Sequence, residues 1–283
     1  MKLAITSDIH FPPEITSKTI LFTRCGYLDD FYIELKKEIQ FFSPRDIDAF
    51  IVCGDFFWDY RYFIHIPYVP PDWGFYNAPI LMLREFRKDL HEQIPLIMIE
   101  GNHDYWFQRY IHSHDGNGFL DIGDYKRFLK DYFGLDEKQA QNTVDLLGGD
   151  VKIGNNMFLL KNEGMLVKDV LVYGLNFYNK EESTVPWPEI KKELTQKYFG
   201  TIESFLRTQD VDIPLKVVLC QHEHPTDSTL VESFSHPSCE VKVFFWGHNH
   251  TVSDAFIERL SRRGPYRCVM PEKNDFKIII KEI

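Results

Sequence analysis

The chain of 283 residues lacks the features that mark secreted, membrane-spanning and nucleic-acid-binding proteins. Its five cysteines show no CxxC or similar metal-binding spacing, which favours reduced thiols in the cytoplasm over a disulfide framework. No window approaches the roughly 18 apolar residues of a membrane helix, and the start MKLAITSDIH predicts neither a signal nor a transit peptide. The formal charge of -10 argues against a surface that binds nucleic-acid phosphates without sequence preference. We therefore expect a cytoplasmic protein without membrane contact.

What the sequence does contain is an alternation of short apolar runs and helical patterns. Hydrophobic residues make up 44% of the chain and charged residues 26%, which is ordinary for a folded globular enzyme. Short runs rich in Val and Ile predict buried strands at Lys2–Thr6, Ala49–Cys53, Leu96–Ile99, Val170–Tyr173, Lys216–Cys220 and Val241–Trp246. Apolar residues three and four positions apart predict helices at Tyr27–Phe41, Ile80–Gln93 and Glu189–Arg207. This alternation indicates a layered α/β fold.

Other segments show different patterns. Short turns within Lys152–Asn176 predict antiparallel strands at Met157–Leu160, Met165–Val167 and Val170–Leu175. Two C-terminal runs, Tyr266–Met270 and Phe276–Lys281, look like a final strand pair. Two stretches are longer than connections need to be: an aromatic one at about 56–78, and 105–150, with helical patterns at Asp124–Phe133 and Glu137–Leu147.

Polar clusters follow five of the apolar runs. They are Asp8-Ile9-His10, Gly54-Asp55, Gly101-Asn102-His103-Asp104, Gln221-His222 and Gly247-His248-Asn249-His250. Because the carboxyl ends of strands line the ligand crevice of open α/β sheets, we expect the clusters to converge. Side chains two positions apart in extended chain point to one side, so Asp8 with His10, and His248 with His250, can each present two ligands. Imidazole, carboxylate and amide oxygen without thiolate suit manganese, iron, cobalt, nickel or zinc.

In this order the blocks D-x-H, G-D, G-N-H-[DE], H and G-H-x-H resemble those of the calcineurin-like metallophosphoesterase superfamily, across residues 8–250. The resemblance implies a four-layer α/β/β/α sandwich of two mixed β-sheets flanked by helices. It also implies two divalent transition-metal ions, with manganese favoured over iron, zinc, cobalt and nickel. One metal would be held by Asp8, His10 and His250, and the other by Asn102, His222 and His248, with Asp55 bridging the two.

The resemblance further implies a metal-dependent phosphoesterase that hydrolyses a phosphomonoester or phosphodiester through a metal-bridging hydroxide. The expected substrate is a phosphorylated small molecule or a nucleotide. His103 would be the general acid, and Asp104 would either orient its imidazole or cap the next turn. A ligand set that runs from Asp8 to His250 does not divide into two independent domains, so we expect one domain over 1–283. The stretches at about 56–78 and 105–150 are then insertions that cap the active site.

Two other functions compete with this interpretation. The superfamily includes DNA-repair nucleases that carry a GNHD block as this chain does, but the acidic charge disfavours nucleic acid as the substrate. Some members are protein-binding scaffolds that have lost site residues, whereas every expected ligand is retained here.

Several residues are weaker candidates for substrate contact. His224 stands two positions after His222 and is the alternative ligand of the fourth block, or otherwise a residue that faces the substrate. Trp58 and Tyr60 begin the aromatic stretch, which either stacks a base or aryl group or packs the loop down as a hydrophobic cluster or oligomer contact. Asn176 and Tyr178 follow another apolar strand and could reach the rim of the crevice.

Overall fold

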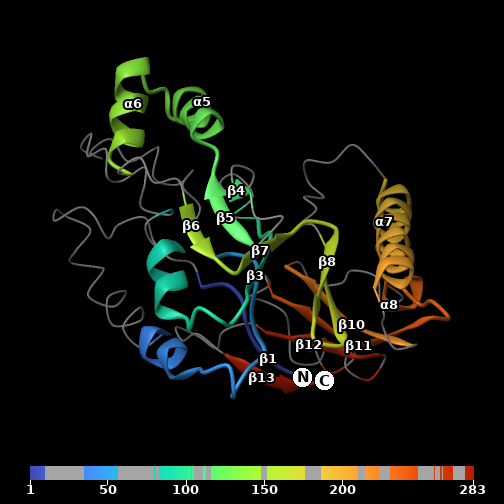
Figure 1. Ribbon diagram of the computed structural model, residues 1–283. Helices are drawn as coiled ribbons and strands as arrows, with labels where there is room; N and C mark the ends of the chain where they lie inside the picture. Colours follow the sequence, from blue (N-terminus) through green and yellow to red (C-terminus); the bar gives the residue numbers. More distant parts are fainter. Residues whose placement is uncertain are drawn as a thin grey trace.

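The computed structural model shows a mixed α/β protein built on two five-stranded sheets (Figure 1). The residues that it describes are 1–9, 35–56, 80, 83–102, 104, 111–112, 116–147, 152–175, 186–209, 214–222, 230–247, 258, 262, 264–269 and 278–283.

The first sheet has the strand order β13-β1-β2-β3-β7. Strands β1, β2, β3 and β7 are parallel, and β13 pairs with β1 in the antiparallel sense. Strands β2 and β3 are buried along their whole length, as expected for parallel strands covered on both faces. The bounds of the five strands are β1 (Lys2–Thr6), β2 (Ala49–Cys53), β3 (Leu96–Ile99), β7 (Met157–Leu160) and β13 (Ile279–Glu282).

The second sheet has the order β12-β11-β10-β9-β8. It is parallel from β9 to β12, and β8 forms an antiparallel hairpin with β9. The bounds are β8 (Glu163–Val167), β9 (Val170–Gly174), β10 (Leu215–Gln221), β11 (Cys239–Trp246) and β12 (Tyr266–Cys268). Both sheets are therefore mixed, as the family resemblance implies.

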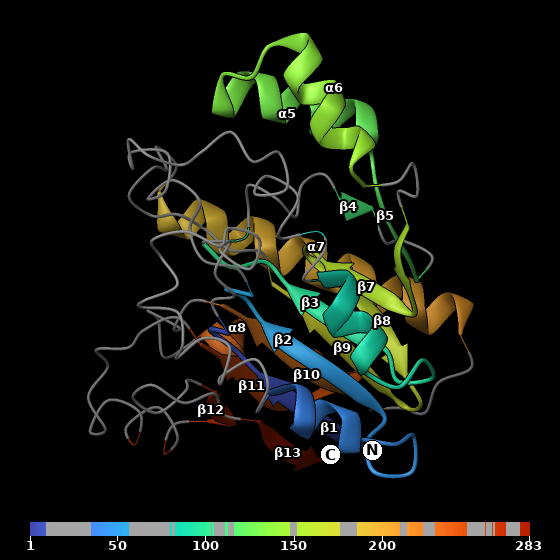
Figure 2. The ribbon, with the colours of Figure 1, turned by 90° about the vertical axis from the view of Figure 1, so that its left-hand side faces the viewer.

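Three clusters of buried apolar side chains follow one another through the protein. Because successive residues of a strand face opposite sides, Leu3 and Ile5 of β1 pack against the second sheet, whereas Ala4 faces the other way. The outer face of the first sheet packs on the helical residues 35–41 and 83–89. The outer face of the second sheet packs on α7 (Trp187–Thr208). Figures 1 and 2 show α7 on one side of the sheets and the other two helical segments on the opposite side, an arrangement consistent with the expected layers.

A smaller unit lies beyond the first sheet. Strands β4 (Ile111–His112), β5 (Asn117–Leu120) and β6 (Lys152–Asn155) form a three-stranded sheet. Helices α5 (Ile122–Phe133) and α6 (Glu137–Asp145) stand above it in Figure 2. Asp121 caps the start of α5, Gly134 ends it in the left-handed conformation, and Asp136 begins α6 with a capping box. These caps explain why the two predicted helices form as separate elements.

Strand pairing corrects two predictions. The C-terminal runs do not form a pair, because β12 joins β11 in the second sheet while β13 joins β1 in the first. Strands β7 and β8 are not antiparallel partners either, because the turn between them carries the chain from one sheet to the other. The hairpin of β8 and β9 is confirmed. Partners of this kind are chosen by long-range packing, which a local turn signal does not report.

Arg87 explains why the helix predicted for Ile80–Gln93 is shorter. Helical geometry ends at residue 89. The Arg87 guanidinium, which is almost fully buried, donates to the carbonyl oxygens of Leu90, His91 and Ile94 at 3.1, 2.8 and 2.9 Å. The guanidinium thus supplies donors to carbonyls just beyond the end of the helix, where intrahelical donors are missing, and the His91 carbonyl also accepts from the Ile94 amide. Burial lowers the pKa of Arg87 to about 10, which leaves the side chain charged at neutral pH.

A short helix, α8 (Leu230–Ser233), lies between β10 and β11 in the chain. None of the described helices combines the length and apolar composition needed to cross a bilayer. The single-domain organisation and the capping role of the two insertions remain predictions. Much of the first insertion, residues 57–79, lies outside the described residues.

Candidate metal centre

The carboxyl ends of the parallel strands bring the described residues of all five predicted clusters to one edge of the sheets. In the first sheet Thr6 pairs with Val52, and Cys53 pairs with Ile99, so the segments of Asp8, Asp55 and Asn102 leave neighbouring strands side by side. In the second sheet Gln221 pairs with Trp246, so His222 and Gly247 also leave together. The Gly247 amide donates to the His222 carbonyl at 2.9 Å, which holds these two strand ends together.

Asp8, Asp55 and His222 meet in a buried cluster. One ligand atom of each lies within 4.8 Å of the others, and the residues are 4%, 1% and 0% exposed. His222 Nε2 lies 3.2 Å from Asp55 Oδ2 and 2.8 Å from Asn102 Oδ1. The structure thus joins side chains from the ends of β1, β2, β3 and β10, which belong to both sheets.

The backbone is unusual at both aspartates. Asp8 has a φ of 55° and Asp55 a φ of 49°, both in the left-handed region, and Gly54 between β2 and Asp55 has a φ of 80°. The Asp8 amide donates to the Gly54 carbonyl at 3.1 Å, which ties the two turns together. Left-handed non-glycine residues cost on the order of 1–3 kcal/mol and persist where the surroundings impose them, often at functional sites. Aspartate is among the residues that tolerate this region best.

Three glycines allow the close approach of these segments. A Cβ atom on Gly54 would lie under 3.0 Å from the His222 imidazole, and one on Gly101 would be equally close to the Asp55 backbone. A Cβ on Gly247 would collide with the side chains of Ser7 and Asp8. The glycine of each G-D, G-N-H and G-H block therefore lies against a residue from another block.

The hydrogen bonds of His222 determine its tautomer. Nδ1 lies 3.0 Å from the Cys53 carbonyl oxygen, which can only accept, so Nδ1 carries a hydrogen. In the neutral ring Nε2 then presents a lone pair to Asn102 Oδ1 and Asp55 Oδ2. The Asn102 and Asp55 oxygens are acceptors too, so the three atoms need a proton or a cation between them.

The pKa of His222 reports the same demand for positive charge. Burial by itself lowers this pKa, but the charge of Asp55, the hydrogen bond to Asp55 and the charge of Asp8 outweigh burial and raise it to about 10. A divalent cation would meet the same demand. The donor set, two carboxylates, one imidazole and one amide oxygen, fits such an ion.

Asp104 is completely buried and links two blocks. Its Oδ2 accepts a hydrogen bond from the Phe56 amide at 3.1 Å, and its own amide donates to the Gly101 carbonyl at 3.2 Å. The carboxylate therefore holds the residue that follows Asp55. Its predicted roles toward His103 or the next turn stay predictions, because His103 lies outside the described residues.

Other predicted site residues also lie outside the described part of the chain. They are the ligands His10, His248 and His250, and the substrate candidates Trp58, Tyr60, His224, Asn176 and Tyr178. His222 lies in the cluster, and the choice of His222 over His224 stays a prediction because His224 lies outside the described residues. Sequence reasoning missed Ser7, whose hydroxyl contacts Asp8, and the carbonyl of Cys53. The sequence offered only one indication of Ser7, which is that a small hydroxyl residue stands just before Asp8. The carbonyl of Cys53 has no sequence indication, because every residue has a carbonyl.

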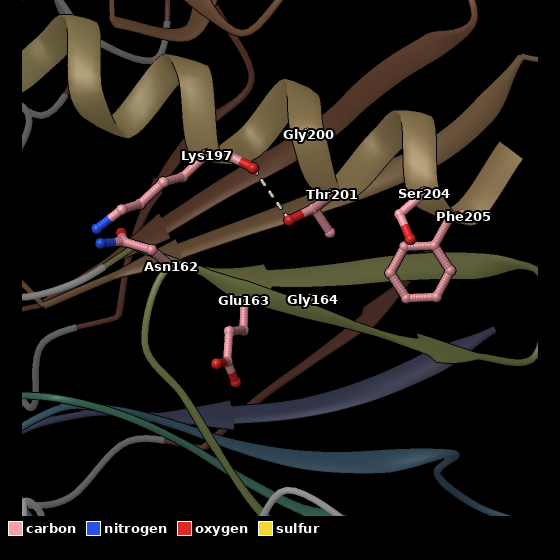
Figure 3. A pocket seen from close by; sticks show the side chains of 8 residues that line it. All are labelled: Asn162, Glu163, Gly164, Lys197, Gly200, Thr201, Ser204 and Phe205. Carbon is pink, nitrogen blue, oxygen red and sulfur yellow. Dashed lines mark hydrogen bonds between the residues drawn. The ribbon is translucent and has the colours of Figure 1, made fainter. Parts of the chain in front are cut away.

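A hollow of about 460 Å³ lies elsewhere, between the start of β8 and helix α7 (Figure 3). Its one lysine, Lys197, forms an ion pair with Glu193 at 2.7 Å, and Thr201 in its wall donates to the Lys197 carbonyl. The residues that line the hollow do not include Asp8, Asp55 or His222. We therefore assign the hollow no part in the metal centre.

Comparison with known families agrees with the geometry. The family model for the calcineurin-like phosphoesterase matches residues 1–252. None of the curated proteins matches the chain.

Proposed function

Since this chain belongs to the calcineurin-like phosphoesterase family, we propose that it hydrolyses a phosphomonoester or phosphodiester at a dinuclear metal centre. Asp8, Asp55, Asn102 and His222 would hold the ions together with His10, His248 and His250. The observation that carries the proposal is the buried convergence of Asp8, Asp55 and His222 from the strand ends of both sheets.

Charge supports a cationic cofactor. Two buried carboxylates surround one imidazole whose Nε2 faces oxygen atoms. Burying carboxylates is costly unless positive charge accompanies them. Divalent ions, with manganese first among the candidates, would supply that charge and the Lewis acidity that activates water and stabilises phosphate oxygens.

The protein's own groups have separate tasks. Asp55 would bridge the ions, as the family resemblance implies, and its place in the cluster with Asp8 and His222 is consistent with that role. His103 would donate the proton that a poor leaving oxygen needs. The two residues that flank His103 in sequence support this role, because Asn102 contacts His222 and Asp104 holds the backbone next to Asp55.

The substrate class rests on charge and sequence. A net charge of -10 disfavours a long nucleic acid and favours a phosphorylated small molecule or a nucleotide. The aromatic stretch that begins with Trp58 and Tyr60 could stack a base or aryl group. From cysteine usage we also propose a cytoplasmic location.

A substrate panel tests the proposal. Purified protein loaded with Mn²⁺ should hydrolyse p-nitrophenyl phosphate, bis-p-nitrophenyl phosphate or a cyclic nucleotide, and Asp55→Asn should abolish that activity. His103→Asn should lower the rate most for substrates with poor leaving groups. Salt-sensitive cleavage of single-stranded DNA in the same panel would indicate the nuclease instead. A pure protein that retains no transition metal after Mn²⁺ supplementation would favour a non-catalytic scaffold.

A further inference from the structure

A layer of hydrogen bonds lies directly behind the ligands and centres on one backbone carbonyl. The carbonyl oxygen of Cys53, the last residue of β2, lies 2.7 Å from Ser7 Oγ and 3.0 Å from His222 Nδ1. Ser7 Oγ also lies 2.5 Å from Asp8 Oδ2. The Cys53 carbonyl therefore contacts two side chains at the centre. One is Ser7, which contacts the ligand Asp8 of the first sheet, and the other is His222, a ligand from the second sheet.

Ser7 is enclosed at the junction of three strand ends. It is completely buried, and it follows β1 directly. Besides its contacts with Cys53 and Asp8, its hydroxyl lies so close to Gly247 that a Cβ atom on this glycine would collide with it. These contacts with the end of β2, with Asp8 and with Gly247 restrict the position of the hydroxyl oxygen.

The backbone of Asp8 needs such support. Its φ of 55° is strained for a residue with a side chain, and its amide is held by the Gly54 carbonyl. The Ser7 hydroxyl has one hydrogen to share between Cys53 O and Asp8 Oδ2, and an ionised carboxylate is the stronger acceptor. The contact with Oδ2 therefore restricts rotation of the Asp8 carboxylate.

We propose that Ser7 is a positioning residue for the metal centre, which orients the Asp8 carboxylate toward the ion that this carboxylate would hold. This inference rests on the proposed dinuclear centre. Ser7 acts on the Asp8 side of that centre, whereas His222 is oriented on the other side by its own hydrogen bond to Cys53 O. Loss of the hydroxyl should therefore weaken one ion more than the other.

Isothermal titration of the metal-free full-length chain with Mn²⁺ tests the inference. Groups that orient metal ligands typically contribute about 10–100-fold to metal affinity. We expect Ser7→Ala to weaken one of two Mn²⁺ ions by about that factor and the second by much less. Ser7→Cys, which keeps a side chain of similar shape with a poor donor, should fall between the wild type and Ser7→Ala.

Thr6→Val is the matched control. Thr6 is the last residue of β1, directly before Ser7, and is also fully buried, but its hydroxyl has no hydrogen-bond partner among the described residues. Valine has the same shape, so this variant should bind both ions as the wild type does. Circular dichroism of the metal-free variants shows whether each one folds. If Ser7→Ala does not fold, the comparison of Ser7→Cys with the wild type decides.

The outcomes separate this inference from the function on which it rests. A wild-type chain that binds two Mn²⁺ ions, with Ser7→Ala and Ser7→Cys binding both equally well, would overturn the role of Ser7 and leave the phosphoesterase proposal standing. Equal weakening of both ions would also overturn it. A wild-type chain that binds no Mn²⁺ would overturn both.

Discussion

Gly101 lies against the Asp55 backbone, and replacing it by alanine tests whether close packing of the blocks positions the metal ligands. A Cβ atom at residue 101 would lie under 3.0 Å from both the amide nitrogen and Oδ1 of Asp55, whereas ordinary contacts begin at 3.4 Å. Asp55 or its neighbours would have to move by more than 0.4 Å. Gly54 stands at 3.0 Å on the same side, so the shift cannot be taken up by a flexible side chain.

The substitution should change both the free energy of unfolding and the affinity for Mn²⁺. Overpacking of a close-packed interior costs about 1–3 kcal/mol in the free energy of unfolding. For a chain of this size that corresponds to a fall of about 2–10 °C in Tm. Metal–ligand distances vary by only about 0.2 Å, so the displacement of Asp55 exceeds what coordination tolerates. We expect Gly101→Ala to weaken Mn²⁺ binding at least about tenfold.

Scanning calorimetry of the metal-free protein and Mn²⁺ titration measure the two effects separately. Gly200→Ala is the control, because Gly200 lies inside α7 and a Cβ there would meet no atom within 4 Å. That substitution should stabilise the protein by about 0.5–1 kcal/mol, since alanine favours a helix interior over glycine, and leave Mn²⁺ affinity unchanged. Wild-type melting and wild-type Mn²⁺ affinity in Gly101→Ala would refute the reasoning.

Three further predictions concern other parts of the protein. Arg87→Met should lower the free energy of unfolding in urea by about 2–4 kcal/mol, because three carbonyls lose a charged donor, and an unchanged midpoint would contradict the capping role of this arginine. Mn²⁺ at 100 times its Kd should raise the free energy of unfolding of the wild type by about 2.7 kcal/mol, and Asp55→Asn should lose most of that gain. A Tm that changes neither with Mn²⁺ nor with a chelator would exclude a metal bound at the cluster. Hydrogen bonds from Lys126 and Lys130 of α5 lower the pKa of Glu137 to about 2. The stabilising contact that Glu137 makes between α5 and α6 should therefore be present above about pH 4.5 and lost as the pH falls toward 2. A carboxyl NMR titration with a midpoint near 4.5 would disprove these contacts.

The ends of the strands show how far sequence reasoning reached at the site. Asp8, Asp55 and His222 were predicted to converge because each follows a buried apolar run, and the structure brings them within 4.8 Å of one another. The left-handed backbone of the two aspartates was not predicted. Neither was the Cys53 carbonyl, since every residue has a carbonyl and only tertiary packing selects the one that two side chains share.

The amino-acid sequence by itself determined the strands of the two five-stranded sheets, most of the helices and the order of the ligand blocks, because these depend on local hydrophobic periodicity and on which side chains follow each run. The short strands β4, β5 and β6 of the three-stranded sheet were not predicted. Only the tertiary structure decided which strands pair, as β12 and β13 illustrate by joining different sheets. It also decided that Ser7 would meet Asp8, Cys53 and Gly247 in one buried junction. Contacts between segments distant in the chain are settled by the packing of whole sheets, which no local pattern encodes.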